Sequence, residues 1–210
     1  SDIYSTGLVV LQSNDYDSKT KYNSTEVVGN PIIDLDGSFT EVQYRINTTP
    51  VNGVLNLPNK KYTANENDTT LVVNKNITID GNGAILDADN LFRIMNITDG
   101  ITVTIKNITF LNGNSSTECG AIRVFGENGT VTILNSAFIN TTARDWGGAI
   151  GGSGSSLRIS NSDFINTTAG TDGGAIEGWN VTVINSNFIN NSAKGNGSSI
   201  YASALIAKYC

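Results

Sequence analysis

Charged and aromatic residues recur at three adjacent positions of an internal repeat, where they could bind a ligand. The set comprises Glu118, Arg144, Asp145, Trp146, Asp172 and Lys194. An aromatic ring beside acidic and basic side chains is the ordinary chemistry of sugar or peptide recognition. If four copies of the repeat stack about 4.8 Å apart, these residues share one ledge about 15 Å long. We therefore expect a ligand-binding site on this ledge. The simpler alternative is a solvated turn whose residues vary freely.

Four copies of one repeat must position these residues. Phenylalanine recurs at spacings of 28, 26 and 24 residues, with an asparagine three residues before it and another two residues after it. A tetrad of small residues that ends in isoleucine begins nine residues after each phenylalanine. The phenylalanines are Phe110, Phe138, Phe164 and Phe188, and the tetrads are Cys119–Ile122, Gly147–Ile150, Gly173–Ile176 and Gly197–Ile200. Repetition with such a period is typical of a solenoid.

Each repeat contains three short stretches that we expect to be strands. The first alternates in polarity, as in Val131-Thr-Ile133, the second surrounds the phenylalanine, and the third lies at the Ala-Ile of the tetrad. Stacked in parallel, phenylalanine would lie on phenylalanine and asparagine on asparagine. We expect the asparagines to point inward at the bends and to form hydrogen bonds from coil to coil.

Only one turn of the repeat varies in length. The gap from the tetrad isoleucine to the next inward strand residue falls from nine to seven to five residues, while the other spacings stay fixed. Steps of two residues preserve the inside-outside parity of the following strand. The pattern predicts an all-β, right-handed parallel β-helix with three short strands per coil, and it fits neither a propeller nor a leucine-rich repeat. Val54–Leu57 is the expected opening strand, and Leu71–Leu86 the expected first, less regular turn.

A short helix is expected ahead of the coil. The capping box Ser38-Phe-Thr-Glu41 begins a pattern that places Phe39, Val42 and Ile46 on one helical face over residues 38–47. We expect this helix to cover the N-terminal edge of the coil, with residues 1–50 as leader and cap and residues 51–210 as the β-helix. Because no polar cap follows Ile200–Cys210, the array is expected to continue beyond this sequence.

Composition excludes several classes of function. The net charge is −6, so the chain lacks the basic face that nucleic-acid binding requires. No run of 18 apolar residues could span a bilayer. Histidine is absent, which removes the commonest general base and the commonest transition-metal ligand. The two cysteines, Cys119 and Cys210, fall several coils apart, and we expect both to be free thiols.

The chain resembles the adhesin-like surface proteins of methanogenic archaea over about residues 38–205. The resemblance is carried by Val73–Gly83, Ile101–Phe110 and the repeated Asn-Ser-x-Phe-x-Asn and Gly-Gly-Ala-Ile motifs. The chain is also similar to the polymorphic outer-membrane proteins of chlamydiae, but its scarce cysteine favours the archaeal family. The resemblance implies an exported β-helix at the cell surface that attaches to a glycan or protein of another cell. It supplies no catalytic residues, and Cys119 and Gly197-Ser-Ser depart from the tetrad pattern.

Glycosylation is a further expectation for an exported chain that is rich in Asn-x-Ser/Thr motifs. Asparagine accounts for 28 of the 210 residues, so many of these motifs arise by chance. The motifs at Asn114, Asn128 and Asn196 fall on predicted turns and are the candidate glycosylation sites.

Two other functions stay open. A polysaccharide lyase or hydrolase would need paired carboxylates or a Ca²⁺-binding acidic cluster, for which two groups are candidates. These groups are Asp80, Asp87, Asp89 and Arg93, and Arg144, Asp145 and Asp172. The aspartates of the first group also suit an Asp-Gly bend. A purely structural spacer is the third class. We expect a monomeric adhesin rather than an enzyme, with a cell-surface glycan or protein as its partner. No cofactor or metal is required, and Ca²⁺ is the one ion that stays open.

Overall fold

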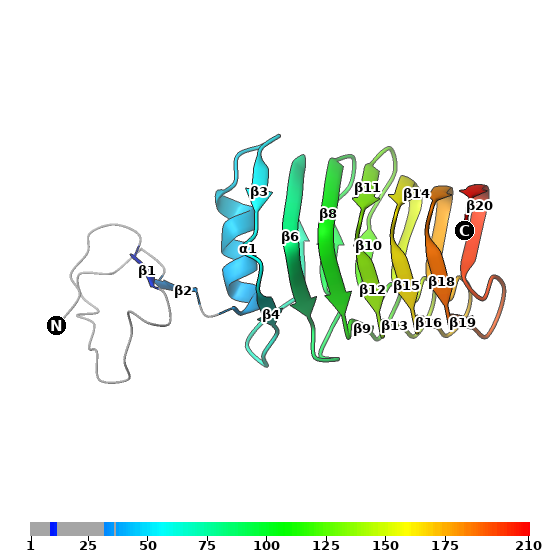
Figure 1. Ribbon diagram of the computed structural model, residues 1–210, viewed down its shortest axis with the longest axis horizontal. Helices are drawn as coiled ribbons and strands as arrows, with labels where there is room; N and C mark the ends of the chain where they lie inside the picture. Colours follow the sequence, from blue (N-terminus) through cyan, green and yellow to red (C-terminus); the bar gives the residue numbers. More distant parts are fainter. Residues whose placement is uncertain (1–8, 12–31, 36) are drawn as a thin grey trace.

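The computed structural model describes residues 9–11, 32–35 and 37–210. In this part of the chain, short strands stack in parallel into one elongated β-helix, and a helix covers one end of it (Figure 1). The predicted all-β parallel β-helix is therefore confirmed. The leader expected before the helix lies mainly outside the described residues. Its described parts include β1 (Val9–Leu11) and β2 (Ile32–Asp34), which pair in parallel.

Three stacks of strands correspond to the three predicted stretches of the repeat. The alternating stack contains β3 (Val54–Asn56), the first parts of β6 (Ile77–Asp87) and β8 (Thr102–Leu111), β11 (Thr130–Leu134), and the second parts of β14 (Ile150–Ser160), β17 (Ile176–Ile184) and β20 (Ile200–Lys208). The phenylalanine stack contains β4 (Lys61–Thr63), the second parts of β6 and β8, β12 (Ala137–Ile139), β15 (Asp163–Ile165) and β18 (Asn187–Ile189). The tetrad stack contains β5 (Leu71–Val73), β7 (Met95–Ile97), β10 (Ile122–Val124) and the first parts of β14, β17 and β20.

A fourth stack of two-residue strands was not predicted. It contains β9 (Asn114–Ser115), β13 (Thr142–Ala143), β16 (Thr168–Ala169) and β19 (Ser192–Ala193). A strand of two residues is too short to show alternation, so the sequence gives no signal for it. These strands fix the start of the nine-residue segment between each phenylalanine and its tetrad, and they leave a turn that contains the predicted ledge.

The coil also begins with a more complete first turn than predicted. The strands β3, β4 and β5 form a full coil, and the stretch expected to be one irregular turn is divided between β5 and β6. The strand β4 was missed because Lys-Tyr-Thr contains one apolar residue. That residue, Tyr62, is fully buried and pairs with Leu86 of the next coil.

The predicted helix is present as α1 (Phe39–Thr48) at the end of the β-helix (Figure 1). Its N-cap residue is Ser38, whose hydroxyl accepts a hydrogen bond from the Glu41 backbone N–H at 3.3 Å. The Glu41 carboxylate is buried, and Arg45 Nε and Lys60 Nζ each lie 2.8 Å from it. The predicted apolar face is buried against the first coils: Phe39, Val42 and Ile46.

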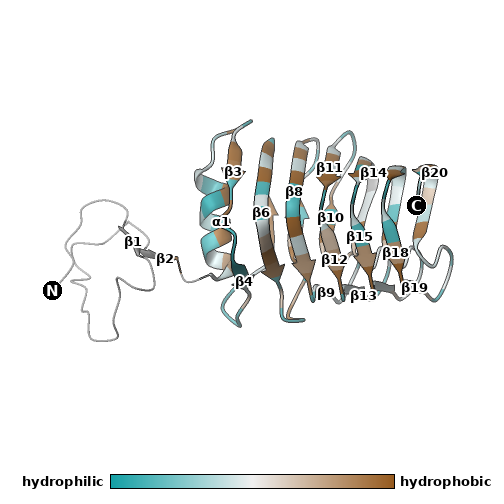
Figure 2. Cartoon of the chain, viewed as in Figure 1, coloured by the Kyte–Doolittle hydropathy of each residue, from teal (hydrophilic) through white to brown (hydrophobic). Residues whose placement is uncertain are grey.

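The variable turn behaves as its even steps predict. Val131, Leu157 and Val181 pair in register and are all buried, although the gaps before them differ by two residues each. In β14 the two extra residues relative to β17 are accommodated by a register shift between Gly152 and Ser156. Apolar residues therefore recur at the same place in successive strands (Figure 2).

A column of phenylalanine rings forms the centre of the core. Adjacent rings of Phe110, Phe138, Phe164 and Phe188 lie with centroids 4.8, 4.9 and 5.0 Å apart and with interplanar angles of 3°, 5° and 3°. The spacing equals the distance between neighbouring strands, so the backbone register imposes the stacking.

The asparagines at the bends form the predicted ladders but point outward, contrary to the prediction. All eight have positive φ between 48° and 57°, a conformation that asparagine tolerates and that turns the chain sharply. In one ladder Asn161 Nδ2 lies 3.3 Å from Asn135 Oδ1, Asn135 Nδ2 lies 3.4 Å from Asn107 Oδ1, and Asn107 Nδ2 lies 2.9 Å from Asp80 Oδ1. A second ladder, through Asn166, Asn140 and Asn112, ends on Asp87.

Serine, not asparagine, satisfies the inward backbone groups at the first bend. Ser136, Ser162 and Ser186 directly follow the ladder asparagines and are buried. The Ser136 N–H donates to Ser162 Oγ, and the Ser162 N–H donates to Ser186 Oγ, both at 3.2 Å. A small hydroxyl fits the crowded interior, where an amide side chain would displace core residues.

Truncation of one phenylalanine ring within the stacked column should destabilise the protein. Phe138→Ala removes a fully buried ring that stacks on both sides, and we expect it to lower the free energy of unfolding by about 3–5 kcal/mol. Chemical denaturation measures this loss. The adjacent Ile139→Ala, on the outward face, should cost no more than about 1 kcal/mol. Equal losses for the two variants would contradict the assignment of faces.

The aspartate at which the first asparagine ladder ends predicts a loss of stability in acid. Lys106 and Asn107 form hydrogen bonds to Asp80 that lower the pKa of its carboxyl from 3.8 to about 2. The stabilisation is therefore present above pH 4 and is lost as the pH falls from about 4 to about 2. Asp80→Asn should lower the free energy of unfolding on the order of 1 kcal/mol at neutral pH and reduce the further loss in that acid range. Thermal unfolding across the range tests this, and Asp99→Asn, at an exposed turn, is the matched control.

Candidate functional site

A groove of about 340 Å³ opens beside the tetrad stack. It is lined by residues of three successive coils and of β20, chief among them Glu118, Arg123, Phe125, Trp146, Gly151, Asp172, Glu177 and Tyr201. We call this hollow the groove. It lies where the ledge turns meet the outward side chains of the tetrad strands.

A glycine leaves the space for the groove. Arg123, Gly151, Glu177 and Tyr201 occupy one column of outward positions, paired in register across β10, β14, β17 and β20. Gly151 contributes no side chain, so a gap remains between Arg123 and Glu177. A Cβ atom at Gly151 would lie 2.7 Å from Cys119 Sγ and 3.4 Å from Glu177 Oε2. A larger residue at this position would therefore fill the floor of the groove.

Three of the six predicted ledge residues meet at the groove. Glu118, Trp146 and Asp172 lie in successive coils and line it together. Their backbones are held in register because the Cys119 N–H donates to the Trp146 carbonyl and the Gly147 N–H to the Asp172 carbonyl. The Trp146 residue is 45% exposed, so much of this large aromatic side chain is open to solvent.

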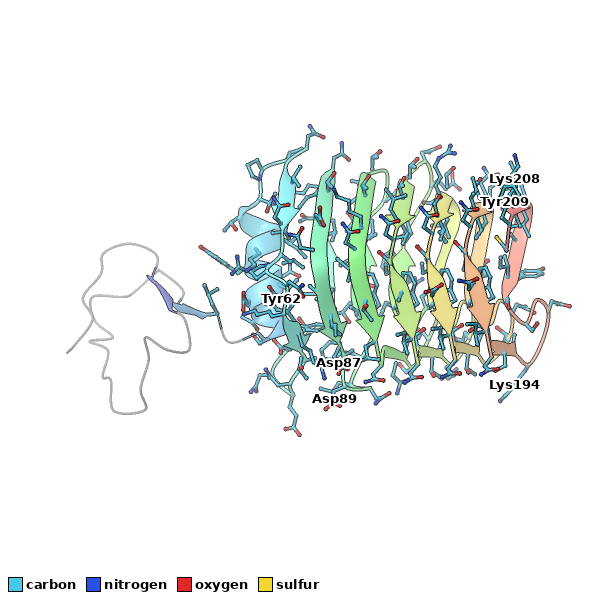
Figure 3. The ribbon with its side chains drawn as sticks, viewed as in Figure 1. Tyr62, Asp87, Asp89, Lys194, Lys208 and Tyr209 are labelled. Carbon is cyan, nitrogen blue, oxygen red and sulfur yellow. The ribbon has the colours of Figure 1, made fainter. Side chains whose placement is uncertain are left out.

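The other three predicted residues lie outside the groove. Arg144 Nε and Asp145 Oδ1 are 3.6 Å apart and form an exposed ion pair. Lys194 is exposed on the turn of a later coil (Figure 3). The ledge therefore exists as a row of turns, but only one of its three positions faces the hollow.

The charged and aromatic residues of the groove that were not predicted are Arg123, Phe125, Glu177 and Tyr201. Three of them directly follow a tetrad isoleucine, so the alternation of a strand places them outward when the isoleucine points inward. Phe125 follows in the variable turn after β10. The signal was present in the sequence, in the residue after each tetrad.

Arg123 is neutralised within the groove. Its Nη1 atom lies 2.9 Å from Glu118 Oε2, and its guanidinium carbon lies 4.3 Å from the centroid of the Phe125 ring. Arg93 lies behind this pair and donates to the carbonyls of Glu118 and Cys119. Arg93 thus positions the segment that carries Glu118.

The side-chain carboxylate of Glu177 has no hydrogen bond or ion pair among the residues that the structure describes. Burial raises the pKa of its carboxyl, and the neighbouring Asp172 and Glu118 raise it further. Burial also raises the pKa of the Cys119 thiol to about 12. Cys119 is therefore a neutral thiol at physiological pH and an unsuitable nucleophile or metal ligand.

The acidic residues considered for an enzyme have other partners. Asp80 binds Lys106 and Asn107, and Asp87 binds Lys61, Asn112 and the Asp89 N–H. Arg93 instead contacts the turn that contains Glu118, as described above. Over residues 9–11, 32–35 and 37–210, no three His, Cys, Asp or Glu side chains group to hold a metal ion.

The free thiols and the sequons complete the placement of predicted residues. Cys119 is buried, Cys210 is exposed and both are free, as expected. The candidate glycosylation sites, Asn114, Asn128 and Asn196, are all exposed. Within the described part of the chain, no helix combines the length and the apolar character needed to cross a bilayer.

Comparison of the chain with models of protein families, with curated proteins and with solved structures finds no match in any of the three.

The unpaired carboxylate predicts that one substitution stabilises the protein. Because the pKa of Glu177 is raised in the folded state, the folded protein binds more protons than the unfolded chain just above pH 4.5, and stability falls as the pH rises through that window. Glu177→Gln should therefore raise the melting temperature at neutral pH and remove this part of the decline. Thermal unfolding from pH 4 to pH 8 measures it. Glu127→Gln, at an exposed turn, is the matched control. A lower melting temperature for Glu177→Gln would contradict the prediction.

Proposed function

We propose that the chain is the binding segment of an adhesin-like surface protein and that its groove binds a glycan at the surface of another cell. The observation that carries this proposal is the grouping of three exposed aromatic side chains around one hollow. Trp146 and Tyr201 are each 45% exposed and Phe125 is 36% exposed, and all three line the groove. Single exposed aromatic residues are common, but a group around a concavity favours a ligand site.

The rest of the fold supports attachment as the role of the groove. A stack of hydrogen-bonded coils is stiff along its axis, and it presents the turns of successive coils as one continuous surface. A ligand held there would contact several coils at once. The resemblance to archaeal adhesin-like proteins and the exposed sequons agree with a surface location, which is part of the proposal.

Loss of one tryptophan should weaken binding strongly. Trp146→Ala removes the exposed ring at the groove, and we expect it to weaken binding to a glycan array or to whole cells by at least about tenfold. Trp179→Ala is the matched control, because Trp179 is 58% exposed but lies outside the groove. Circular dichroism should show both variants folded.

Unchanged binding by Trp146→Ala, or equal loss in both variants, would contradict the proposal. Release of shortened glycan from the array would favour the hydrolase alternative instead, with Asp172 and Glu177 as the carboxylates of the groove.

A further inference from the structure

The charges of the groove do not balance. Glu118 forms an ion pair with Arg123 at 2.9 Å and a longer one with Arg93 at 3.9 Å, so both cations beside the groove already have a carboxylate partner. Two further carboxylates, Asp172 and Glu177, line the same hollow. Asp172 accepts a hydrogen bond from the Asn196 N–H, but neither carboxylate has an ion pair among the described residues. The groove thus contains two carboxylates without an ion-pair partner, and its three carboxylates outnumber the two arginines beside it.

Within the described chain, the arginines near the groove pair with carboxylates other than Asp172 and Glu177. Arg93 donates to Ser115, Thr117, Asn96 and the carbonyls of Glu118 and Cys119, and it forms a 3.9 Å ion pair with the Glu118 carboxylate. Arg144 pairs with Asp145 outside the groove. A bound cation would therefore relieve an existing repulsion instead of displacing an internal partner.

The aromatic side chains suit the same kind of ligand. The face of an aromatic ring attracts a cation, and the effect is strongest for tryptophan. Arg123 already lies over the Phe125 ring, which shows this chemistry within the groove itself. Trp146 and Tyr201 have no such partner in the described residues and remain exposed.

The size of the groove favours a small unit over a protein surface. About 340 Å³ lies at the lower end of volumes for small-molecule pockets, whereas a stable protein interface is broad. A sugar ring stacks on tryptophan through its apolar face and offers hydroxyls to carboxylates. Acidic sugars, by contrast, would be repelled by the two unpaired carboxylates.

We propose that the groove selects glycans with a free amino group, and that Asp172 and Glu177 hold the protonated amine beside Trp146. This inference rests on the proposed glycan binding and specifies the ligand class. The raised pKa of Glu177 agrees with it, since burial beside like charges disfavours the carboxylate until a cation binds.

The test uses one matched pair of ligands with the full chain. A glucosamine tetramer and its fully N-acetylated counterpart differ in the charge of the amine, and calorimetry at a pH where the amines are protonated measures both affinities. We expect the free-amine tetramer to bind at least about tenfold more tightly. Glu177→Gln should remove most of that preference, as should Asp172→Asn, while the exposed Glu127→Gln retains it. Because Glu177→Gln is expected to stabilise the fold, a loss of preference would not reflect unfolding.

The outcomes separate the two proposals. Binding of both tetramers with equal affinity, lost in Trp146→Ala, would overturn the amine selectivity and leave glycan binding in place. A lysine tripeptide that binds while neither tetramer does would overturn both the amino-sugar assignment and glycan binding. Tight binding of a glucuronic acid oligomer would overturn the charge argument. Absence of any binding that depends on Trp146 would overturn the proposed function itself.

Discussion

Backbone hydrogen bonding between coils is the constraint on which the rest of the structure depends. Each parallel strand must lie about 4.8 Å from its equivalent in the next coil, so every side chain meets its counterpart at that distance. Aromatic rings then stack, serine hydroxyls meet backbone N–H groups, and asparagine amides form ladders. Residues that tolerate a copy of themselves as a neighbour are retained at these positions. A charged residue repeated at an inward position would stack on a like charge, which favours apolar and hydroxyl side chains in the repeated coils.

The groove forms where this repetition is broken. In the column of outward residues after the tetrad isoleucines, Arg123 and Glu177 are separated by Gly151, and the missing side chain leaves a hollow. The ledge turn beside it varies as well, and Trp146 stands there between Glu118 and Asp172. Regular positions therefore maintain the coil, while irregular positions at two adjacent columns create a surface that can recognise a ligand.

The sequence predicted the fold well because the repeat constrains it many times over. Phe138 and its equivalents, the tetrads and the even-numbered gaps each indicate the same stacked coil, and the helix at Ser38 has a clear cap. The predicted inward direction of the asparagine side chains was wrong, because the backbone conformation at Asn135 and its equivalents decides which way these side chains point. The site was harder, because it depends on which turns and strands meet in three dimensions. Three of the six predicted ledge residues line the groove, but the outward residues that follow the tetrad isoleucines were not predicted.

The asparagine ladders have a direction with an electrostatic consequence. Three asparagine amides of each ladder donate toward the preceding coil: Asn107, Asn135 and Asn161 in one, and Asn112, Asn140 and Asn166 in the other. Their side-chain dipoles therefore add along the axis, as peptide dipoles do in an α-helix. The positive end of each ladder meets a carboxylate, Asp80 or Asp87, which can only accept. These aspartates act on the ladders as acidic residues act on a helix N-terminus. Each ladder is thus electrically polar along the axis, although it repeats the same asparagine from coil to coil.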